Sequence, residues 1–144
     1  MDLLTEVEKV SKAKADTEVR ITRRIESGSV LHQGDVYLHR VKDDHPRGKM
    51  LGTRQVAVGT TIGSCHIVDG DGVEVFAGNK LPNWVKAPEW CRESDILGPV
   101  VTVSDTCTLT HQEHAHHQIP AGTYQVTYQA DFSSFTQFTK KHLS

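Results

Sequence analysis

The sequence predicts an all-β fold, a small antiparallel β barrel or sandwich, preceded by an N-terminal α-helix. Three observations predict it: seven short stretches rich in alternating β-branched residues, turn dipeptides between several of them, and few helical patterns after residue 28. A length of 144 residues is that of one domain. We therefore expect a helical extension over residues 1–28 and a β-barrel domain over residues 29–144.

The extension begins with apolar residues at helical spacing, namely Leu3, Leu4, Val7 and Val10. They predict an amphipathic helix over residues 2–15, whose apolar stripe either joins two copies of the chain in a homo-oligomer or packs on its own domain. Residues 17–25 alternate Val19 and Ile21 within a charged segment, and this pattern fits a helix or a strand equally. Gly28 ends the segment in both cases.

Short strands follow, separated by turns. The expected strands are residues 30–41, 54–58, 65–68, 73–76, 100–103, 106–110 and 123–129. An Asp-Gly-Asp-Gly turn at residues 69–72 predicts that the two strands around it pair as a hairpin. Further turns are expected at residues 104–105 and 120–122.

A long segment rich in proline, residues 78–99, interrupts the strands. It holds both tryptophans, Trp84 and Trp90. Long irregular loops within compact domains are often lids or binding loops, and the alternative is that the two indoles cap one open end of the β core.

Charge and composition exclude several classes of protein. Sixteen Lys and Arg residues against 18 Asp and Glu residues leave a net charge of -2, which gives no overall attraction to nucleic acid or to a membrane surface. No apolar run approaches the roughly 20 residues that cross a bilayer. Three cysteines cannot all pair within one chain, and the N-terminus lacks a signal-peptide pattern, so we expect a cytoplasmic protein.

Histidine is the unusual residue, with nine copies, four of them in residues 110–117. His111 and His114 lie on the connection between two expected strands, where both rings can reach one point. Glu113 lies between them as a third ligand, an orienting group or a general base. His66 lies within an apolar strand and needs a buried partner, which the connection can supply. In contrast, His39 and His45 are expected on the solvated surface.

Convergence of His66, His111 and His114 would create the three-imidazole ligand set of a zinc, manganese or iron ion with an open position. Together with Glu113, these histidines are the predicted catalytic residues. The pattern fits two other interpretations equally: metal-free histidines for acid–base chemistry or phosphate binding, and a structural or solvated hairpin. Residues predicted to contact a ligand are Asp35, Arg54, Trp84 and Trp90.

These residues predict a pocket for an anionic small molecule or a nucleotide, and three functions remain open. The first is hydrolysis assisted by metal or histidine. The second is sequestration of the same ligand without turnover. The third is an interaction protein that self-associates through its N-terminal helix.

Four motifs resemble those of a group of short, largely uncharacterised bacterial and phage proteins. The similarity spans residues 31–132, and its motifs are residues 33–36, 59–66, 109–114 and 120–129. That group carries Gly-His-x-His in the second motif, where this chain has Ser64 in place of the first histidine. The resemblance implies a shared site without implying a reaction.

A looser similarity is to cupins, small β barrels that hold metal on histidines. It lies in the Pro-Ala-Gly turn at residues 120–122, which precedes a late strand. Tyr124 stands where a cupin commonly has its last histidine. This resemblance implies a type of fold only.

Overall fold

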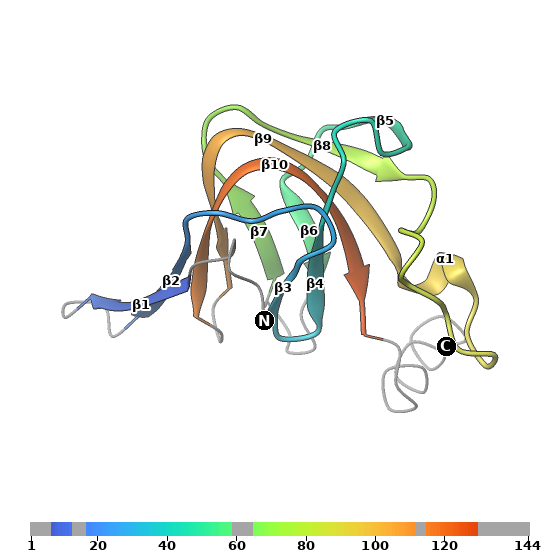
Figure 1. The fold of residues 1–144 in the computed structure, drawn as a ribbon, viewed down its shortest axis with the longest axis horizontal. Coiled ribbons are helices and arrows are strands. Elements are labelled where there is room, and N and C mark those ends of the chain that lie inside the picture. The colour runs from blue at the N-terminus through green and yellow to red at the C-terminus, as the bar shows by residue number, and fades with distance from the viewer. Residues whose placement is uncertain (1–6, 13–16, 59–64, 112–114, 130–144) are drawn as a thin grey trace.

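The structure is a computed structural model that describes residues 7–12, 17–58, 65–111 and 115–129. Within these residues, ten strands form one curled and mostly antiparallel sheet, with a single short helix (Figure 1). The elements are β1 (Val7–Lys12), β2 (Thr17–Thr22), β3 (Val30–Gln33), β4 (Val36–Val41), β5 (Arg47–Leu51), β6 (Gln55–Val58), β7 (Cys65–Asp69), β8 (Val73–Gly78), α1 (Glu93–Ile96), β9 (Leu97–Thr110) and β10 (His116–Tyr128).

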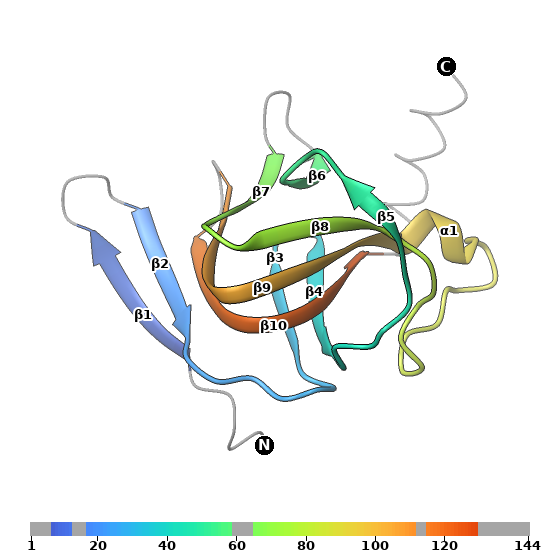
Figure 2. The same ribbon diagram turned by 90° about the horizontal axis from the view of Figure 1, so that it is seen from above.

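The long β9–β10 hairpin arches over the middle of the molecule, and four of the other eight described strands pair with it directly (Figures 1 and 2). The first half of β9 pairs with β8, and its last residues pair with β7. The start of β10 pairs with β2 in the parallel direction, and its second half pairs with β4. Because one bent hairpin holds strands along both edges, the sheet curls into a half-barrel.

Side-chain hydrogen bonds bridge the open side of the half-barrel. The Tyr128 hydroxyl, at the end of β10, donates to the Val56 carbonyl of β6 over 2.7 Å. The Gln33 amide, at the end of β3, donates to the carbonyls of Leu109 and Ala115 at the β9–β10 connection. These bonds join opposite sides of the curled sheet, between strands that share no backbone ladder within the described residues.

The enclosed side is apolar. Its largest fully buried side chains include Tyr124, Leu38, Leu109 and Ile119. The Cys107 thiol packs in the same cluster, and burial, with a smaller effect from the Asp69 carboxylate, raises its pKa to about 12. Cys107 is thus a protonated core residue at neutral pH, as is usual for a free buried cysteine.

Strand β4 is buried on both faces, which its alternation alone does not predict. Val36 and Leu38 face the core, while His39 and Val41 lie on the outer face of the sheet and are also buried. The turn before β4 contains Gly34, whose φ of 60° is readily adopted only by glycine. The irregular segment after β8 contacts the outer face, because its Trp84 indole donates to Nδ1 of His39.

The predicted N-terminal helix is wrong over residues 7–12, which form β1 of a hairpin with β2. The rest of the predicted helix lies outside the described residues. Two features favour strands over a helix in this segment. The apolar residues Val7, Val10, Val19 and Ile21 are all β-branched, and β2 also pairs with β10. A third strand stabilises a hairpin that would be marginal alone. The helical stripe is therefore absent over residues 7–12, and self-association of the chain stays a prediction.

The pairing predicted across the turn at residues 69–72 and two further predicted turns need correction. The strands around residues 69–72, β7 and β8, do not pair with each other within the described residues; each pairs with a different part of β9. Residues 104–105 and 120–122 lie within the long strands β9 and β10, close to an irregularity in their register. Polar and glycine residues there bend a continuous ladder instead of ending it.

The remaining strand predictions agree with the structure, apart from details. The stretch 30–41 divides into β3 and β4, and strand β5 had no predicted counterpart. Residues 79–92 are irregular, as expected, and are followed by α1. Among the described residues, no helix has the length and apolar character needed to cross a membrane.

Candidate functional site

The first component of the site is a buried glutamine that sequence reasoning missed. Gln33, 2% exposed, donates through Nε2 to the Leu109 carbonyl at 3.0 Å and to the Ala115 carbonyl at 2.7 Å. An amide nitrogen has two hydrogens, and both are used. Its Oε1 is left as an acceptor, and it lies 2.8 Å from Nδ1 of His66.

These contacts set the tautomer of His66. Because Oε1 of Gln33 only accepts, Nδ1 of His66 must carry the hydrogen that it donates. In the neutral ring, the lone pair is then on Nε2. A hydrogen bond to the non-coordinating nitrogen is the usual means by which proteins orient a histidine for metal binding or proton transfer.

The structure brings His66 and His111 together. Their ring centroids lie 4.2 Å apart, with the ring planes 33° from parallel. His66 is 3% exposed and His111 is 5% exposed. Two imidazolium charges this close and this buried would repel each other strongly.

Glu113 and His114 lie outside the described residues, so their predicted roles stay predictions. The chain on both sides of them is held at the site, because Gln33 binds the carbonyls of Leu109 and Ala115. Among the described residues, no group of three His, Cys, Asp or Glu side chains could hold a metal ion. The described part of the site is therefore a histidine pair with its orienting glutamine.

The predicted ligand-contacting residues have other neighbours in the structure. Asp35 is exposed, and its backbone carbonyl accepts a hydrogen bond from the backbone N–H of Gln129, just after β10. The exposed Arg54 donates to the Gly70 carbonyl. Trp84 and Trp90 belong to the irregular segment and are 49% and 38% exposed. Their part in ligand binding is still a prediction.

A signal for Gln33 was present in the sequence. Leu31 and Gln33 are two residues apart in a strand, so they share a face, and the structure buries both. A polar residue on the core face of a strand needs buried partners, so the rule that predicts a buried partner for His66 predicts one for Gln33 as well.

A second polar cluster lies on the outer face of the sheet, where His39 was expected to be solvated. His39 is only 8% exposed; the Trp84 indole donates to its Nδ1 over 3.1 Å. Its Nε2 lies 2.9 Å from the Thr127 hydroxyl. An indole only donates, so Nδ1 must be an acceptor and His39 must be neutral. Likewise His45 is engaged rather than solvated, with Nε2 close to the Lys80 carbonyl and to Oε1 of Gln125.

Acid should therefore release Trp84 from the sheet. Burial lowers the pKa of His39 below its ordinary value of 6.5. Between the folded-state pKa and 6.5, the unfolded chain therefore binds more protons than the folded chain. The stability that neutral, buried His39 contributes is fully present above pH 6.5 and is lost as the pH falls through the folded-state pKa. We expect tryptophan emission to shift to the red over that range.

The matched variant for this prediction is His39→Gln, whose amide can accept from Trp84 and donate to Thr127 without titrating. Its emission should depend less on pH than that of the wild type. Identical pH profiles for the two proteins, recorded by fluorescence, would contradict the assignment.

Fold and site together define a class of protein: a half-barrel β domain with a buried histidine pair at the connection of its longest hairpin. The chain belongs to the family described as a domain of unknown function (DUF8820), whose profile matches residues 32–129. The match includes the histidine pair and Gln33 and excludes β1 and β2. No curated protein and no solved structure gives a significant match to the chain.

Proposed function

We propose that the histidine pair belongs to a divalent metal site that binds an anionic small molecule or a nucleotide. His66, His111 and His114 are the proposed ligands, and Glu113 is a further ligand or a general base. The observation that carries the proposal is the hydrogen bond from His66 to Gln33, because it directs the lone pair of a buried imidazole to Nε2 beside a second imidazole.

The distance between the rings supports a shared ion. With metal–nitrogen bonds of about 2.1 Å, two imidazoles bound at a right angle to one ion have ring centroids about 4.5 Å apart. The 4.2 Å between His66 and His111 is close to that value. A right angle is typical of six-coordinate iron or manganese, and a wider angle is typical of tetrahedral zinc.

A bound divalent ion would supply a positive charge for an anionic ligand and could activate a water molecule. The chain's own residues would set the conditions for this. Gln33 holds the proton on Nδ1 of His66, and the apolar core behind the pair strengthens electrostatic interactions. Glu113, two residues after His111, would accept a proton in the hydrolytic version of the site.

Metal content tests the proposal. Protein purified without a metal-affinity tag should contain about one equivalent of zinc, manganese or iron by elemental analysis, as expected for a single three-histidine site. His66→Ala and His111→Ala should each lose it. The control is His32→Ala, since His32 is an exposed histidine on β3.

Wild-type protein that stays metal-free after incubation with each of the three ions would contradict the proposal. So would retention of the metal in both site variants. Folded state is checked by circular dichroism in every case, so that a loss of metal cannot be attributed to unfolding.

Catalysis and sequestration are separated by incubating the metal-loaded protein with a panel of nucleotides and cyclic nucleotides. Chromatography would show product if the site hydrolyses its ligand, and intact ligand recovered with the protein if the site only binds it. In the hydrolytic case, Glu113→Gln should remove product formation and leave binding.

A further inference from the structure

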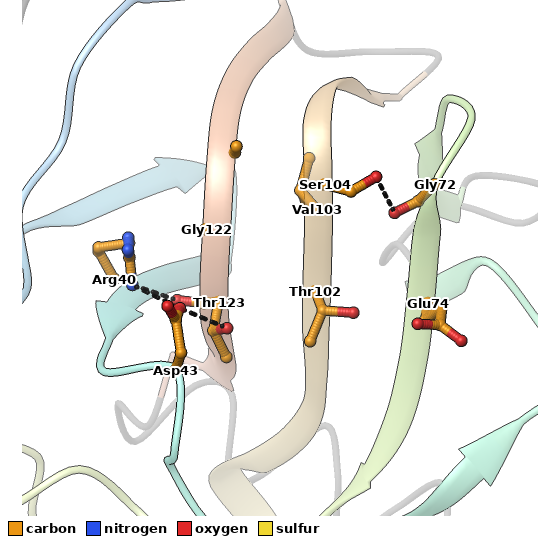
Figure 3. A pocket seen from close by; sticks show the side chains of 10 residues that line it. Arg40, Asp43, Gly72, Glu74, Thr102, Val103, Ser104, Gly122 and Thr123 are labelled. Atoms are coloured by element: carbon orange, nitrogen blue, oxygen red, sulfur yellow. Dashed lines mark hydrogen bonds and ion pairs between the residues drawn. The ribbon is translucent and has the colours of Figure 1, made fainter.

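A separate groove lies on the outer face of the sheet, across β8, β9, β10 and the end of β4. Its volume is about 390 Å³, and its polar lining includes Arg40, Asp43, Glu74, Thr102, Ser104 and Thr123 (Figure 3). We call it the outer groove. Core residues such as Val101 and Tyr124 alternate with Thr102 and Thr123 along the strands, so Thr102, Thr123 and Glu74, which is opposite Thr102, lie on the face away from the histidine pair. Arg40 is opposite Tyr124 in the register, so its side chain starts on the enclosed face, and it lines the groove at the end of β4.

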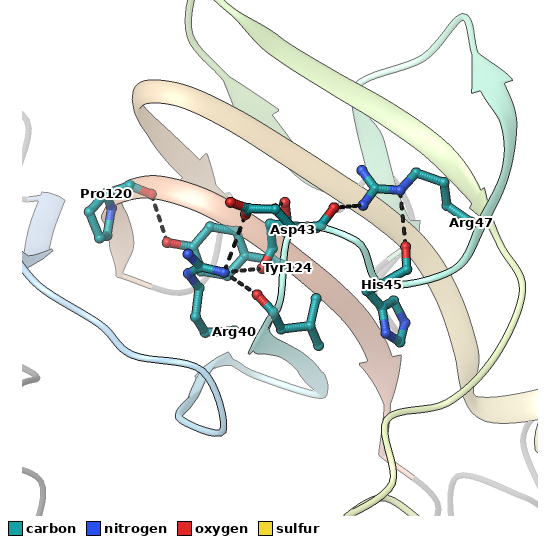
Figure 4. Close-up of polar contacts among 8 residues, drawn as sticks. Arg40, Asp43, His45, Arg47, Pro120 and Tyr124 are labelled. Carbon is teal, nitrogen blue, oxygen red and sulfur yellow. Dashed lines mark hydrogen bonds and ion pairs between the residues drawn. The ribbon is translucent and has the colours of Figure 1, made fainter.

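Arg40 is the strongest donor in the outer groove. Its side chain is 18% exposed, and Nη1 is directed to the carbonyls of Val41 and Thr123 and toward the Asp43 carboxylate, 3.7 Å away (Figure 4). Its Nε is buried and, within the described part of the chain, has no hydrogen-bond partner. A guanidinium group has five N–H donors, and this one has donors in excess of its protein acceptors.

Gly122 provides the space for this arginine. A Cβ atom at residue 122 would collide with Nε of Arg40, and the φ of 152° at Gly122 also disfavours other residues. The neighbouring Tyr124 hydroxyl donates to the Pro120 carbonyl over 2.7 Å (Figure 4). The Pro-Ala-Gly motif thus shapes the outer groove as well as bending β10.

The remaining lining supplies acceptors and hydroxyl groups. Asp43, on the same side as Arg40, accepts from the Thr123 hydroxyl over 3.0 Å. Glu74 is exposed on β8 at the opposite side, with Thr102 between them (Figure 3). The Ser104 hydroxyl donates to the Gly72 carbonyl, so its oxygen can still accept.

The charged groups and hydroxyl groups of the lining indicate which kind of ligand the outer groove can bind. Two carboxylates against one guanidinium make the lining slightly negative, which disfavours phosphate and other polyanions. A polyhydroxylated molecule offers oxygens that accept from Arg40 and hydroxyls that donate to Glu74. The volume is near the lower end for ligand pockets, so the molecule must be small.

We propose that the outer groove binds an uncharged polyhydroxylated molecule of the size of a monosaccharide unit, with Arg40 as the main donor and Glu74 as the main acceptor. Among the residues that the structure describes, no aromatic side chain lines the groove for a sugar ring to stack on. Affinity therefore depends on polar contacts in an open groove and should be weak, with a Kd of about 1 mM.

The test is a titration of isotopically labelled full-length protein with methyl glycosides of glucose, galactose, mannose and N-acetylglucosamine, followed by amide NMR shifts. At least one glycoside should shift the amides of Thr102, Ser104 and Thr123. Arg40→Lys should weaken binding about tenfold, because a point charge replaces a planar fork of donors.

Glu74→Gln, an exposed change that should leave the fold intact, should weaken binding about fivefold, and the matched control Glu89→Gln, an exposed acid on the irregular segment, should not. His66→Ala should also leave the titration unchanged, which separates this proposal from the metal site. Absence of shifts with all four glycosides would overturn the proposal. It would also be overturned if inorganic phosphate alone shifted these amides, or if Glu74→Gln bound as tightly as the wild type.

Discussion

Replacing Gln33 with alanine should lower the free energy of unfolding by about 4 kcal/mol, because three buried groups lose their partner at about 1 to 2 kcal/mol each. These groups are the carbonyls of Leu109 and Ala115 and the Nδ1–H of His66. The same change removes a bridge across the open side of the half-barrel. For a chain of this length, the melting temperature should fall by about 10 °C or more.

Thermal and denaturant unfolding, followed by circular dichroism, measure this effect. The matched control is Gln55→Ala on β6, because Gln55 is an exposed glutamine in a strand. That change should alter stability by less than about 0.5 kcal/mol. Gln33→Glu tests the chemistry as well as the size of the side chain, since a carboxylate placed against two carbonyls cannot donate to them and should destabilise the protein too. An alanine variant as stable as the control would show that the buried amide does not close the half-barrel.

Replacing Leu38 with alanine should lower the free energy of unfolding by about 3 kcal/mol, through lost burial and the cavity left behind. Leu38 is fully buried at the centre of β4, opposite Leu31 of β3 on one side and Val126 of β10 on the other. The two neighbouring strands hold it in place, so the core has little freedom to collapse around a missing side chain.

The same unfolding measurements apply, and Val30→Ala provides the comparison. Val30 lies on the adjacent strand β3 but is 50% exposed, so its truncation should cost less than about 0.5 kcal/mol. Equal losses of stability in the two variants would mean that the cluster around Leu38 is not the core that stabilises the sheet.

Short stretches of sequence were enough to predict that the chain is rich in strands. They were also enough to predict that a connection rich in histidines lies between the last two strands. Both depend on properties that a strand shows in its own sequence: alternation, β-branched residues, and polar residues between two strands. For the same reason, His111 could be placed between the last two strands. The burial of His66 could also be predicted, because its neighbours in the strand are apolar.

Strand partners could not be predicted in this way. The Asp-Gly-Asp-Gly turn is typical of a hairpin, yet β7 and β8 each pair with β9, because a strand of 14 residues offers enough edge for both. The segment Val7–Lys12 shows the same limit. Its spacing fits a helix, and its β-branched residues fit a strand. Pairing with β2, which also pairs with β10, favours the strand.

By itself, the sequence determined that this chain is β-rich and that four of its nine histidines lie at one strand connection, since alternation and composition act over a few residues. Only the tertiary structure decided which groups meet. The curl of the β9–β10 hairpin brings Gln33 to the carbonyls of Leu109 and Ala115, 76 and 82 residues away along the chain. Buried polar groups need hydrogen-bond partners, and the fold decides which partners they meet. In this fold Gln33 orients the ring of His66, and the Trp84 indole holds His39 in its neutral, buried form.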